Sequence, residues 1–260
     1  MKEKSALITG STSGLGFAIA NALAGAGCNI LLHGLEAPSE MESCRKAIED
    51  AHGVSAHYLR ADLRDAEAIE DLMAKVQTLT GGADILVNNA VVRHFASIED
   101  FPTSKWEEAL AINLSAAFHT IRLALPGMRA RQWGRIFNMT SVYSLRGTPN
   151  RIDYVTTKSA LLGMTRCVAA ETINQGITCN TVCPGTVHTP SIENRLVALM
   201  SKEGLDRDAA LRRFLDRKQP TARFIDASQV GSLIVFLCSP AASSINGAML
   251  PIDDGWLAAG

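Results

Sequence analysis

A glycine-rich segment near the start of the chain, TGSTSGLG at residues 9–16, lies between an apolar stretch and a long helical pattern. Glycine lets a backbone turn tightly and approach a phosphate closely, and the N–H groups that open the following helix face the anion. An ordinary strand-to-helix turn also contains glycines, so a glycine triplet alone is weak evidence. Here the segment follows the first strand-like run and opens a helix, which is the context that dinucleotide binding requires. The turn therefore favours a nucleotide-binding α/β fold.

Strand-like apolar runs alternate with helical patterns along most of the chain. The predicted strands are residues 5–9, 29–33, 55–59, 84–88, 134–140, 177–183 and 248–252. Helical segments of roughly ten to twenty residues lie between them, and one of these ends in a predicted C-cap at His52-Gly53. Such alternation predicts a parallel sheet with helices on both faces. Seven strands with a glycine-rich first turn favour an open, doubly wound, Rossmann-type sheet over an eight-stranded barrel.

One stretch, residues 189–220, breaks the alternation, because it predicts two helices with no strand between them. An insertion after the carboxyl end of a strand lies over the ligand crevice of such a sheet, so this stretch is a candidate substrate lid. The sequence shows no linker, repeat or low-complexity segment. We therefore predict one catalytic domain over residues 1–260.

Composition argues against several other classes of protein. Lysine and arginine (25) nearly balance aspartate and glutamate (26), whereas a general nucleic-acid binder needs a basic excess. The first residues resemble neither a signal peptide nor a membrane anchor, and the longest apolar run, around GSLIVFLC, is too short to cross a bilayer. The six cysteines lack C-x-x-C spacing and the six histidines are dispersed. We expect reduced thiols, no metal site and a cytoplasmic location.

The end of the second predicted strand, LLHGLE at residues 31–36, bears on the choice of cofactor. No arginine or lysine stands there, or in STS at residues 11–13, to hold a 2′-phosphate. The acid that usually binds the adenosine ribose is absent at Gly34, although Glu36 follows two residues later. This pattern favours NAD over NADP. Asp62, after the third strand, fits a contact to the adenine amino group as well as it fits a surface turn.

Five motifs in order resemble the short-chain dehydrogenase/reductase family over nearly the whole chain. TGSTSGLG resembles its TGxxxGxG turn, and YVTTK at residues 154–158 resembles its YxxxK motif. NNAV at residues 88–91 resembles its NNAG strand end, with Val91 where glycine is usual. Asn113 in AINLSAAF resembles its helix asparagine, and CPGTVHTP its PG-x-x-x-T segment. Ser141 stands thirteen residues before the tyrosine, which is the family's spacing.

The resemblance implies an NAD-dependent oxidoreductase acting on a CH–OH group. It implies that the cofactor is bound by Gly10, Ser11, Thr12, Ser13, Gly14, Leu15, Gly16, Leu35, Asp62, Leu63, Asn89, Ala90, Tyr154, Lys158, Pro184, Gly185, Val187 and Thr189. Thr189 and the backbone before it would hold the nicotinamide carboxamide. Related enzymes are usually tetramers, so the resemblance also implies a homotetramer.

Tyr154 and Lys158 stand one helical turn apart within TPNRIDYVTTKSA at residues 148–160. Alone, this spacing also suits an amphipathic helix that buries a ring and snorkels a lysine. A free tyrosine has a pKa of about 10 and is a poor base at neutral pH, but a neighbouring ammonium stabilises the phenolate. Tyr154 is therefore the predicted acid–base residue. The resemblance implies that Lys158 also holds the nicotinamide ribose, that Ser141 bonds the substrate oxygen, and that Asn113 holds a water linking Lys158 to solvent.

Within the family, segments such as IEDFP, NLSAAF, WGRIFN, RKQP and DDGW resemble bacterial D-3-hydroxybutyrate dehydrogenases, which use NAD. Compared with their pocket, two glutamines and one lysine are replaced here by arginines, and one tryptophan by threonine. The resemblance implies that substrate is contacted by Arg93, Ser141, Tyr143, Arg151, Tyr154, Thr186, Arg195 and Trp256. Arginine pairs bidentately with anionic oxygens in a way that glutamine cannot. Each arginine could also be a solvated surface residue, above all Arg195.

Three functions stay open at this point. The first is a dehydrogenase for a small anionic hydroxy or oxo acid, larger or more anionic than 3-hydroxybutyrate. The second is a 3-hydroxybutyrate dehydrogenase with a variant pocket, and the third is a catalytically silent NAD-binding scaffold. The complete set of Ser141, Tyr154, Lys158 and Asn113 argues against the third. We expect no nucleic-acid or membrane partner.

Overall fold

The computed structural model describes residues 1–216 and 218–259. Within them, parallel strands form one sheet in the order β3-β2-β1-β4-β5-β6-β7. The strands are β1 (Ser5–Ile8), β2 (Asn29–Gly34), β3 (Ala56–Arg60), β4 (Ile85–Asn88), β5 (Gly134–Met139), β6 (Ile177–Pro184) and β7 (Met249–Ile252). The strand order reverses between β1 and β4, so the ligand crevice is expected at their carboxyl ends. The predicted Rossmann-type sheet is confirmed.

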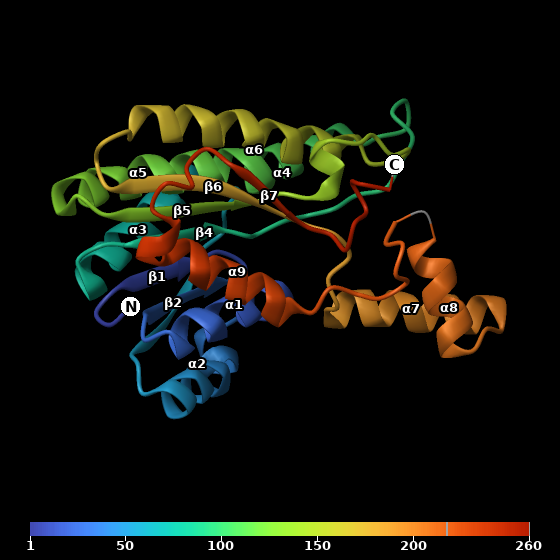
Figure 1. Cartoon of the computed structure of the whole chain (residues 1–260), viewed down its shortest axis with the longest axis horizontal. Helices are drawn as coiled ribbons and strands as arrows, with labels where there is room; N and C mark the ends of the chain where they lie inside the picture. Colours follow the sequence, from blue (N-terminus) through green and yellow to red (C-terminus); the bar gives the residue numbers. More distant parts are fainter. Residues whose placement is uncertain (217, 260) are drawn as a thin grey trace.

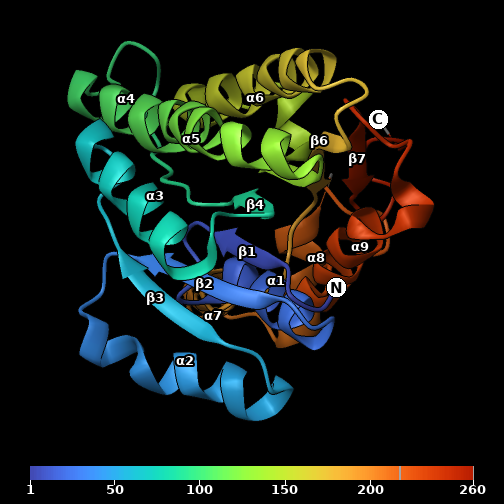
Figure 2. The same cartoon turned by 90° about the vertical axis from the view of Figure 1, so that its left-hand side faces the viewer.

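Helices cover both faces of this sheet (Figures 1 and 2). One layer contains α1 (Gly14–Gly25), α2 (Pro38–His52) and α9 (Ala227–Cys238), and the other contains α3 (Ala66–Thr80), α4 (Thr103–Leu110), α5 (Ala116–Arg131) and α6 (Ile152–Glu171). The predicted cap at the end of α2 is confirmed, because Gly53 adopts the left-handed conformation (φ 66°) that glycine tolerates best.

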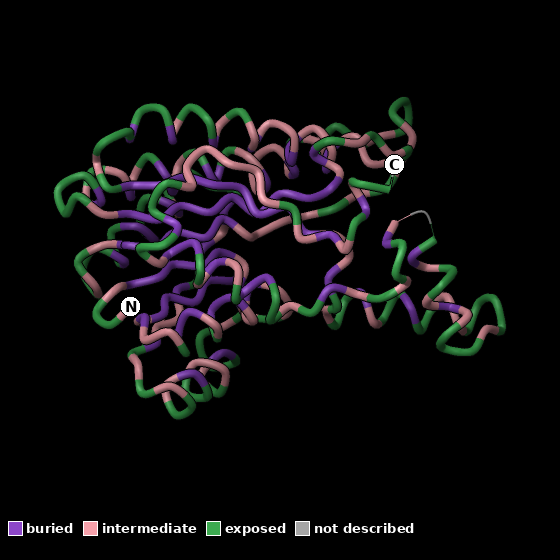
Figure 3. The backbone as a smooth tube through the Cα atoms, in the orientation of Figure 1, coloured by how far each residue is buried: buried purple, intermediate pink, exposed green. Residues whose placement is uncertain are grey.

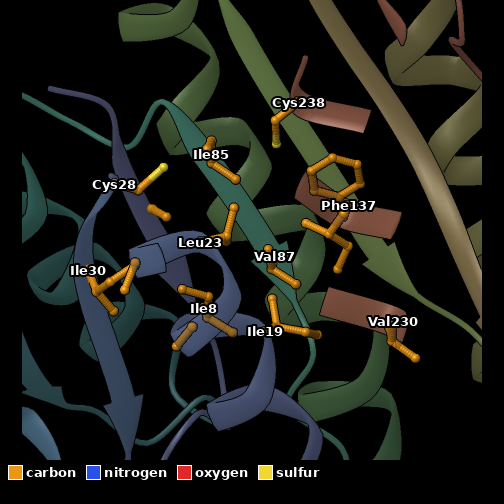
Figure 4. Packing of buried hydrophobic residues seen from close by; sticks show 14 of the residues in the cluster. Ile8, Ile19, Leu23, Cys28, Ile30, Ile85, Val87, Phe137, Val230 and Cys238 are labelled. Carbon is orange, nitrogen blue, oxygen red and sulfur yellow. The ribbon is translucent and has the colours of Figure 1, made fainter. Parts of the chain in front are cut away.

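The core lies in two apolar layers, one on each face of the sheet. Figure 3 shows the inner strands buried along most of their length, as expected where a parallel sheet is covered on both sides, whereas the edge strand β7 has no buried residue. In the layer between the sheet and α1 and α9, Ile8, Ile19 and Val230 pack near Phe137 (Figure 4). This packing fixes the glycine turn before α1 against the sheet.

Two helices follow β6 without an intervening strand, as predicted for residues 189–220. They are α7 (Pro190–Glu203) and α8 (Arg207–Leu215), and they project beyond the sheet, apart from both helical layers (Figure 1). An ion pair joins them, with Arg207 Nη1 2.5 Å and Nη2 3.0 Å from the Glu193 carboxylate. Arg217 of the predicted lid and Gly260 of the predicted domain lie outside the described residues. The action of this segment as a lid stays a prediction.

Helices α4 and α5 join through a π-helical turn, Ala111–Ser115, into a continuous helix over Thr103–Arg131. By length and composition alone, this helix could cross a membrane. It packs against α3, α6 and the sheet, however, so it is more simply a core helix of the domain. The π turn contains Asn113, and single π turns within helices often occur at functional sites.

Candidate active site

A cavity of about 490 Å³ opens at the carboxyl ends of the strands, within the size range of small-molecule sites. Its walls come from the turns after β1, β4, β5 and β6, from the start of α6, and from the α7–α8 segment. All but two of the predicted site residues line it, and the two exceptions are Ser11 and Asn113. The fold therefore brings into one cavity the residues predicted to bind cofactor, to act in catalysis and to contact substrate, although they are dispersed in the sequence.

The glycine turn is close-packed. A Cβ atom on Gly10 (φ 61°) would meet Ala90 Cα at 2.9 Å, and one on Gly16 would collide with the Gly10 carbonyl oxygen. Bare backbone thus faces the cavity at the start of α1, where N–H groups and the helix dipole favour an anion. These residues fit a dinucleotide pyrophosphate.

His33, at the end of β2, holds this turn in place. Its Nδ1 accepts a hydrogen bond from Gly10 N–H (3.1 Å), and its Nε2 lies 3.2 Å from Ala61 O. Burial lowers the pKa of His33 to about 4, so the ring is neutral at pH 7 and its Nδ1 is free to accept. Ser11 faces the same interior, with its hydroxyl donating to Ile8 O (2.7 Å) and accepting from His33 N–H (3.0 Å). The segment LLHGLE did not predict this role for His33 from the sequence.

Two acids stand at the outer end of the cavity. Glu36 accepts hydrogen bonds from Thr12 Oγ1 (2.8 Å) and Leu35 N–H (2.9 Å). Burial alone would raise its pKa, but these bonds and that from its own N–H outweigh burial and lower it. Asp62 is paired bidentately with Arg64, which lowers the Asp62 pKa. Glu36 is thus a carboxylate fixed beside the glycine turn, whereas Asp62 already has a partner.

Tyr154, Ser141 and Lys158 share one wall of the cavity. The Tyr154 side chain is buried, and Lys158 Nζ lies 5.8 Å from its ring centroid. Lys158 Nζ also donates to Met139 O (2.6 Å). Burial, followed by the charge of Arg93, lowers the pKa of Lys158 to about 7. The amine of Lys158, next to this tyrosine, therefore titrates near neutral pH.

Asn113 does not line the cavity, but it hydrogen-bonds the backbone of Val92, which does. From the π turn, its side-chain Oδ1 accepts from Val92 N–H (2.8 Å) and its Nδ2 donates to Val92 O (3.0 Å). Asp153, on α6, accepts from His94 N–H (3.1 Å). These hydrogen bonds hold the backbone of Val92 and of His94, the two residues that flank Arg93 in the chain. The water that Asn113 is expected to hold stays a prediction.

The three predicted arginines all reach the cavity. The Cζ atoms of Arg93 and Arg151 lie 5.3 and 4.5 Å from the Tyr154 ring centroid. Arg195 Cζ lies 5.3 Å from the Phe214 ring centroid. Burial lowers the pKa values of Arg151 and Arg195. None of the three forms an ion pair with a carboxylate in residues 1–216 and 218–259.

Aromatic rings line the part of the cavity that holds the predicted substrate residues. Tyr143 packs edge-on against Tyr154 and Trp256, with ring centroids 6.3 and 5.3 Å apart. Thr186 lies on the cavity wall where the resemblance places a tryptophan. Phe214 and Lys218 also line the cavity, and neither is among the residues predicted from the sequence. Lys218 belongs to RKQP, which entered only through a resemblance, and no local pattern shows that this segment returns to the site.

Comparisons with known proteins agree with this geometry. Residues 10–257 match the family model described as Enoyl-(Acyl carrier protein) reductase, a model of short-chain dehydrogenases/reductases. The chain is 44% identical over 259 residues to a D-beta-hydroxybutyrate dehydrogenase of Cupriavidus necator, covering 99% of each chain. It is 41% identical to a D-beta-hydroxybutyrate dehydrogenase of Rhizobium meliloti, covering 98% of this chain and 99% of that one.

A solved structure is also closely similar. L-sorbose reductase from Gluconobacter frateurii, complexed with NADPH and L-sorbose, superposes with a TM-score of 0.94 at 30% sequence identity. The similarity covers 99% of this chain and 97% of the reductase. The relatives thus include enzymes for a hydroxy acid and for a sugar, and one of them contains the phosphorylated cofactor.

Proposed function

The chain belongs to the short-chain dehydrogenase/reductase family of oxidoreductases, and from this premise we propose that it transfers hydride between NAD and a small hydroxy or oxo acid. The reacting group is a secondary hydroxyl or the corresponding ketone. One observation carries the proposal: the Tyr154 ring stands in the cavity wall with Lys158, Arg93 and Arg151 within 6 Å of its centroid. These groups place positive charge beside the residue that the family motif assigns to proton transfer, and positive charge attracts an acidic substrate.

The chemistry follows from these positions. In the direction of oxidation, the Tyr154 phenolate accepts the hydroxyl proton of the substrate, and Ser141 donates a hydrogen bond to the same oxygen. The bound nicotinamide supplies the hydride acceptor. Lys158, whose pKa burial lowers to about 7, lies next to Tyr154 on α6 and would hold the nicotinamide ribose. The protein's part is to place the groups and to polarise the oxygen.

The proposed preference for NAD is supported by Glu36. Its carboxylate, fixed by Thr12 and Leu35, stands at the end of β2, where an adenosine ribose hydroxyl would donate to it. The same carboxylate repels a 2′-phosphate. Arg60 is a cation close to this segment, with its Nε donating to Leu35 O (2.9 Å), but Arg60 does not line the cavity.

The proposed substrate is larger or more anionic than 3-hydroxybutyrate. Three cavity arginines that pair with no carboxylate of the described residues are costly to confine unless an anion meets them. Thr186 leaves space that a tryptophan would fill. The second candidate is 3-hydroxybutyrate itself, which the names of the two bacterial relatives favour. A single domain, a homotetramer and a cytoplasmic location stay predictions beside this proposal.

A panel of hydroxy acids tests the proposal, with NADH formation followed for each acid. We expect turnover with NAD, and a higher kcat/KM for larger or dianionic acids than for 3-hydroxybutyrate. Replacing Arg93 and Arg195 by glutamine, together with Thr186→Trp, should shift the preference back toward 3-hydroxybutyrate. If 3-hydroxybutyrate outperforms every other acid with the unaltered chain, the second candidate replaces the first.

A further inference from the structure

Besides the three arginines and Lys158, the cavity is lined by Lys218, from the segment after α8. Its Nζ lies 4.7 Å from the Phe214 ring centroid, and Arg195 Cζ lies 5.3 Å from the same centroid. The three arginines and Lys218 therefore form two groups. Arg93 and Arg151 surround the Tyr154 ring, whereas Arg195 and Lys218 surround Phe214 on the α7–α8 segment.

Lys218 is held at this place by its neighbour in the chain. Gln219 is buried, and its side chain accepts from Thr186 N–H (2.5 Å) and donates to Arg223 O. Thr186 directly follows the turn at the end of β6, so Gln219 fastens the returning end of the segment to the sheet. Lys218 Nζ donates to Phe214 O (2.8 Å), which directs the ammonium along the cavity wall.

Within residues 1–216 and 218–259, the positive charges of Arg195 and Lys218 have no carboxylate partner. Burial lowers the pKa of Lys218, and the charges of Arg195 and Arg151 lower it further. Two partly buried like charges that face one cavity raise the free energy of the empty site, and an anion between them lowers it.

We infer that Arg195 and Lys218 form a second anion-binding subsite, so that the preferred substrate is a hydroxy or oxo acid with two anionic groups. This inference rests on the proposed function and extends it. The first anionic group meets Arg151 beside Tyr154, and the second, a carboxylate or phosphate, meets Arg195 and Lys218. Phe95 contacts one member of each group, with Arg151 Cζ 4.4 Å and Arg195 Cζ 6.0 Å from its ring centroid. These two distances limit the separation of the Cζ atoms to 10.4 Å, which a short carbon chain can bridge.

Matched substrates isolate the second charge. We compare 3-hydroxyglutarate with 3-hydroxypentanoate, and 3-hydroxyadipate with 3-hydroxyhexanoate, because each pair differs only by carboxylate or methyl at the far end. The unaltered chain should show the lower KM for the diacid. In Lys218→Gln the KM of the diacid should rise at least about tenfold more than that of the monoacid, since one charge-assisted contact is lost. Lys218→Arg should restore most of the preference.

A matched control removes a lysine from the same segment but outside the cavity. Lys202, on α7, is exposed, so Lys202→Gln should leave the ratio of the two KM values unchanged. If Lys218→Gln raises KM equally for diacid and monoacid, Lys218 acts only on structure and the inference fails. It also fails if monoacids are preferred by the unaltered chain.

Calorimetric titration keeps the inference separate from the proposed function, because it needs no turnover. If no hydroxy acid yields NADH, the proposed function fails, and the subsite is still tested by titrating glutarate and pentanoate into the protein. Binding of glutarate alone, lost in Lys218→Gln, supports the subsite. Inorganic phosphate that binds more tightly than glutarate, with the same dependence on Lys218, assigns the second group as a phosphate. Equal binding of glutarate and pentanoate overturns the inference.

Discussion

Replacing Lys158 by methionine should remove activity and yet stabilise the fold near neutral pH. The Lys158 side chain is 3% exposed, and its burial lowers the pKa from the ordinary 10.5 to about 7. In the unfolded chain the same amine is solvated and keeps its ordinary pKa. Folding therefore has a desolvation cost, because it buries an ammonium group that water solvates in the unfolded chain. Methionine carries no charge and avoids this cost.

The magnitude and direction follow from proton linkage. Between pH 7 and pH 10.5 the unfolded state binds more protons at Lys158 than the folded state does, so stability rises with pH over this window and is lowest below pH 7. One pKa unit corresponds to about 1.36 kcal/mol. The lowered pKa of Lys158 therefore reduces the free energy of unfolding by at most about 4 kcal/mol at pH 7 and by about 2 kcal/mol at pH 9. The lost hydrogen bond to Met139 O does not depend on pH in this range, so it shifts both values equally.

Urea unfolding of both chains at pH 7, 8 and 9, at one protein concentration, measures this effect through tryptophan fluorescence. The free energy of unfolding of Lys158→Met minus that of the unaltered chain should fall by about 2 kcal/mol from pH 7 to pH 9. The cysteines titrate in the same way in both chains, so their contribution cancels in the difference between the two free energies of unfolding. Lys202→Met, at an exposed site, should show no such trend. A difference that stays constant between pH 7 and pH 9 would refute the reasoning, because Lys158 would then keep its ordinary pKa when folded.

Three further outcomes are expected. Tyr154→Phe should lower kcat by about a hundredfold or more while NAD affinity, measured by NADH fluorescence, barely changes; near-full activity would exclude Tyr154 as the acid–base residue. Steady-state kcat/KM should be higher with NAD than with NADP, and Glu36→Gln should narrow that ratio, whereas an unchanged ratio would remove Glu36 from cofactor selection. Hydrogen exchange in α7 and α8 should slow when cofactor and substrate are both bound, and equal rates in free and bound protein would indicate a fixed cap.

Much of the fold was predictable because its signals are local. Apolar runs of four to eight residues and helical periodicity are set by neighbouring residues, so the strand order along the chain and the two helices after β6 follow from the sequence. Strand ends were less certain: residues 55–59 were predicted where β3 covers Ala56–Arg60. A strand ends where its pairing with a neighbour ends, and that neighbour is distant in sequence.

The residues of the candidate site also differ in how far the sequence predicts them. Motif spacing identifies the glycine turn, Tyr154, Lys158 and Ser141, because each lies on an element whose place in the fold the alternation already predicts. The resemblance to the hydroxybutyrate dehydrogenase pocket, rather than motif spacing, assigned Arg151 to substrate. It placed Ser11 among the cavity residues, although the Ser11 side chain faces the interior.

The sequence by itself determined a doubly wound sheet with a dinucleotide turn and a tyrosine–lysine pair, because these depend on periodicity and short spacings. Only the tertiary structure decided how the cations are arranged. The Asn113 amide holds the Val92 backbone from 21 residues away, and Gln219 reaches Thr186 from 33 residues away, and these two contacts place Arg93 and Lys218. Such contacts form after the sheet and helices have packed, and no local pattern encodes which distant backbone group a buried side chain will meet.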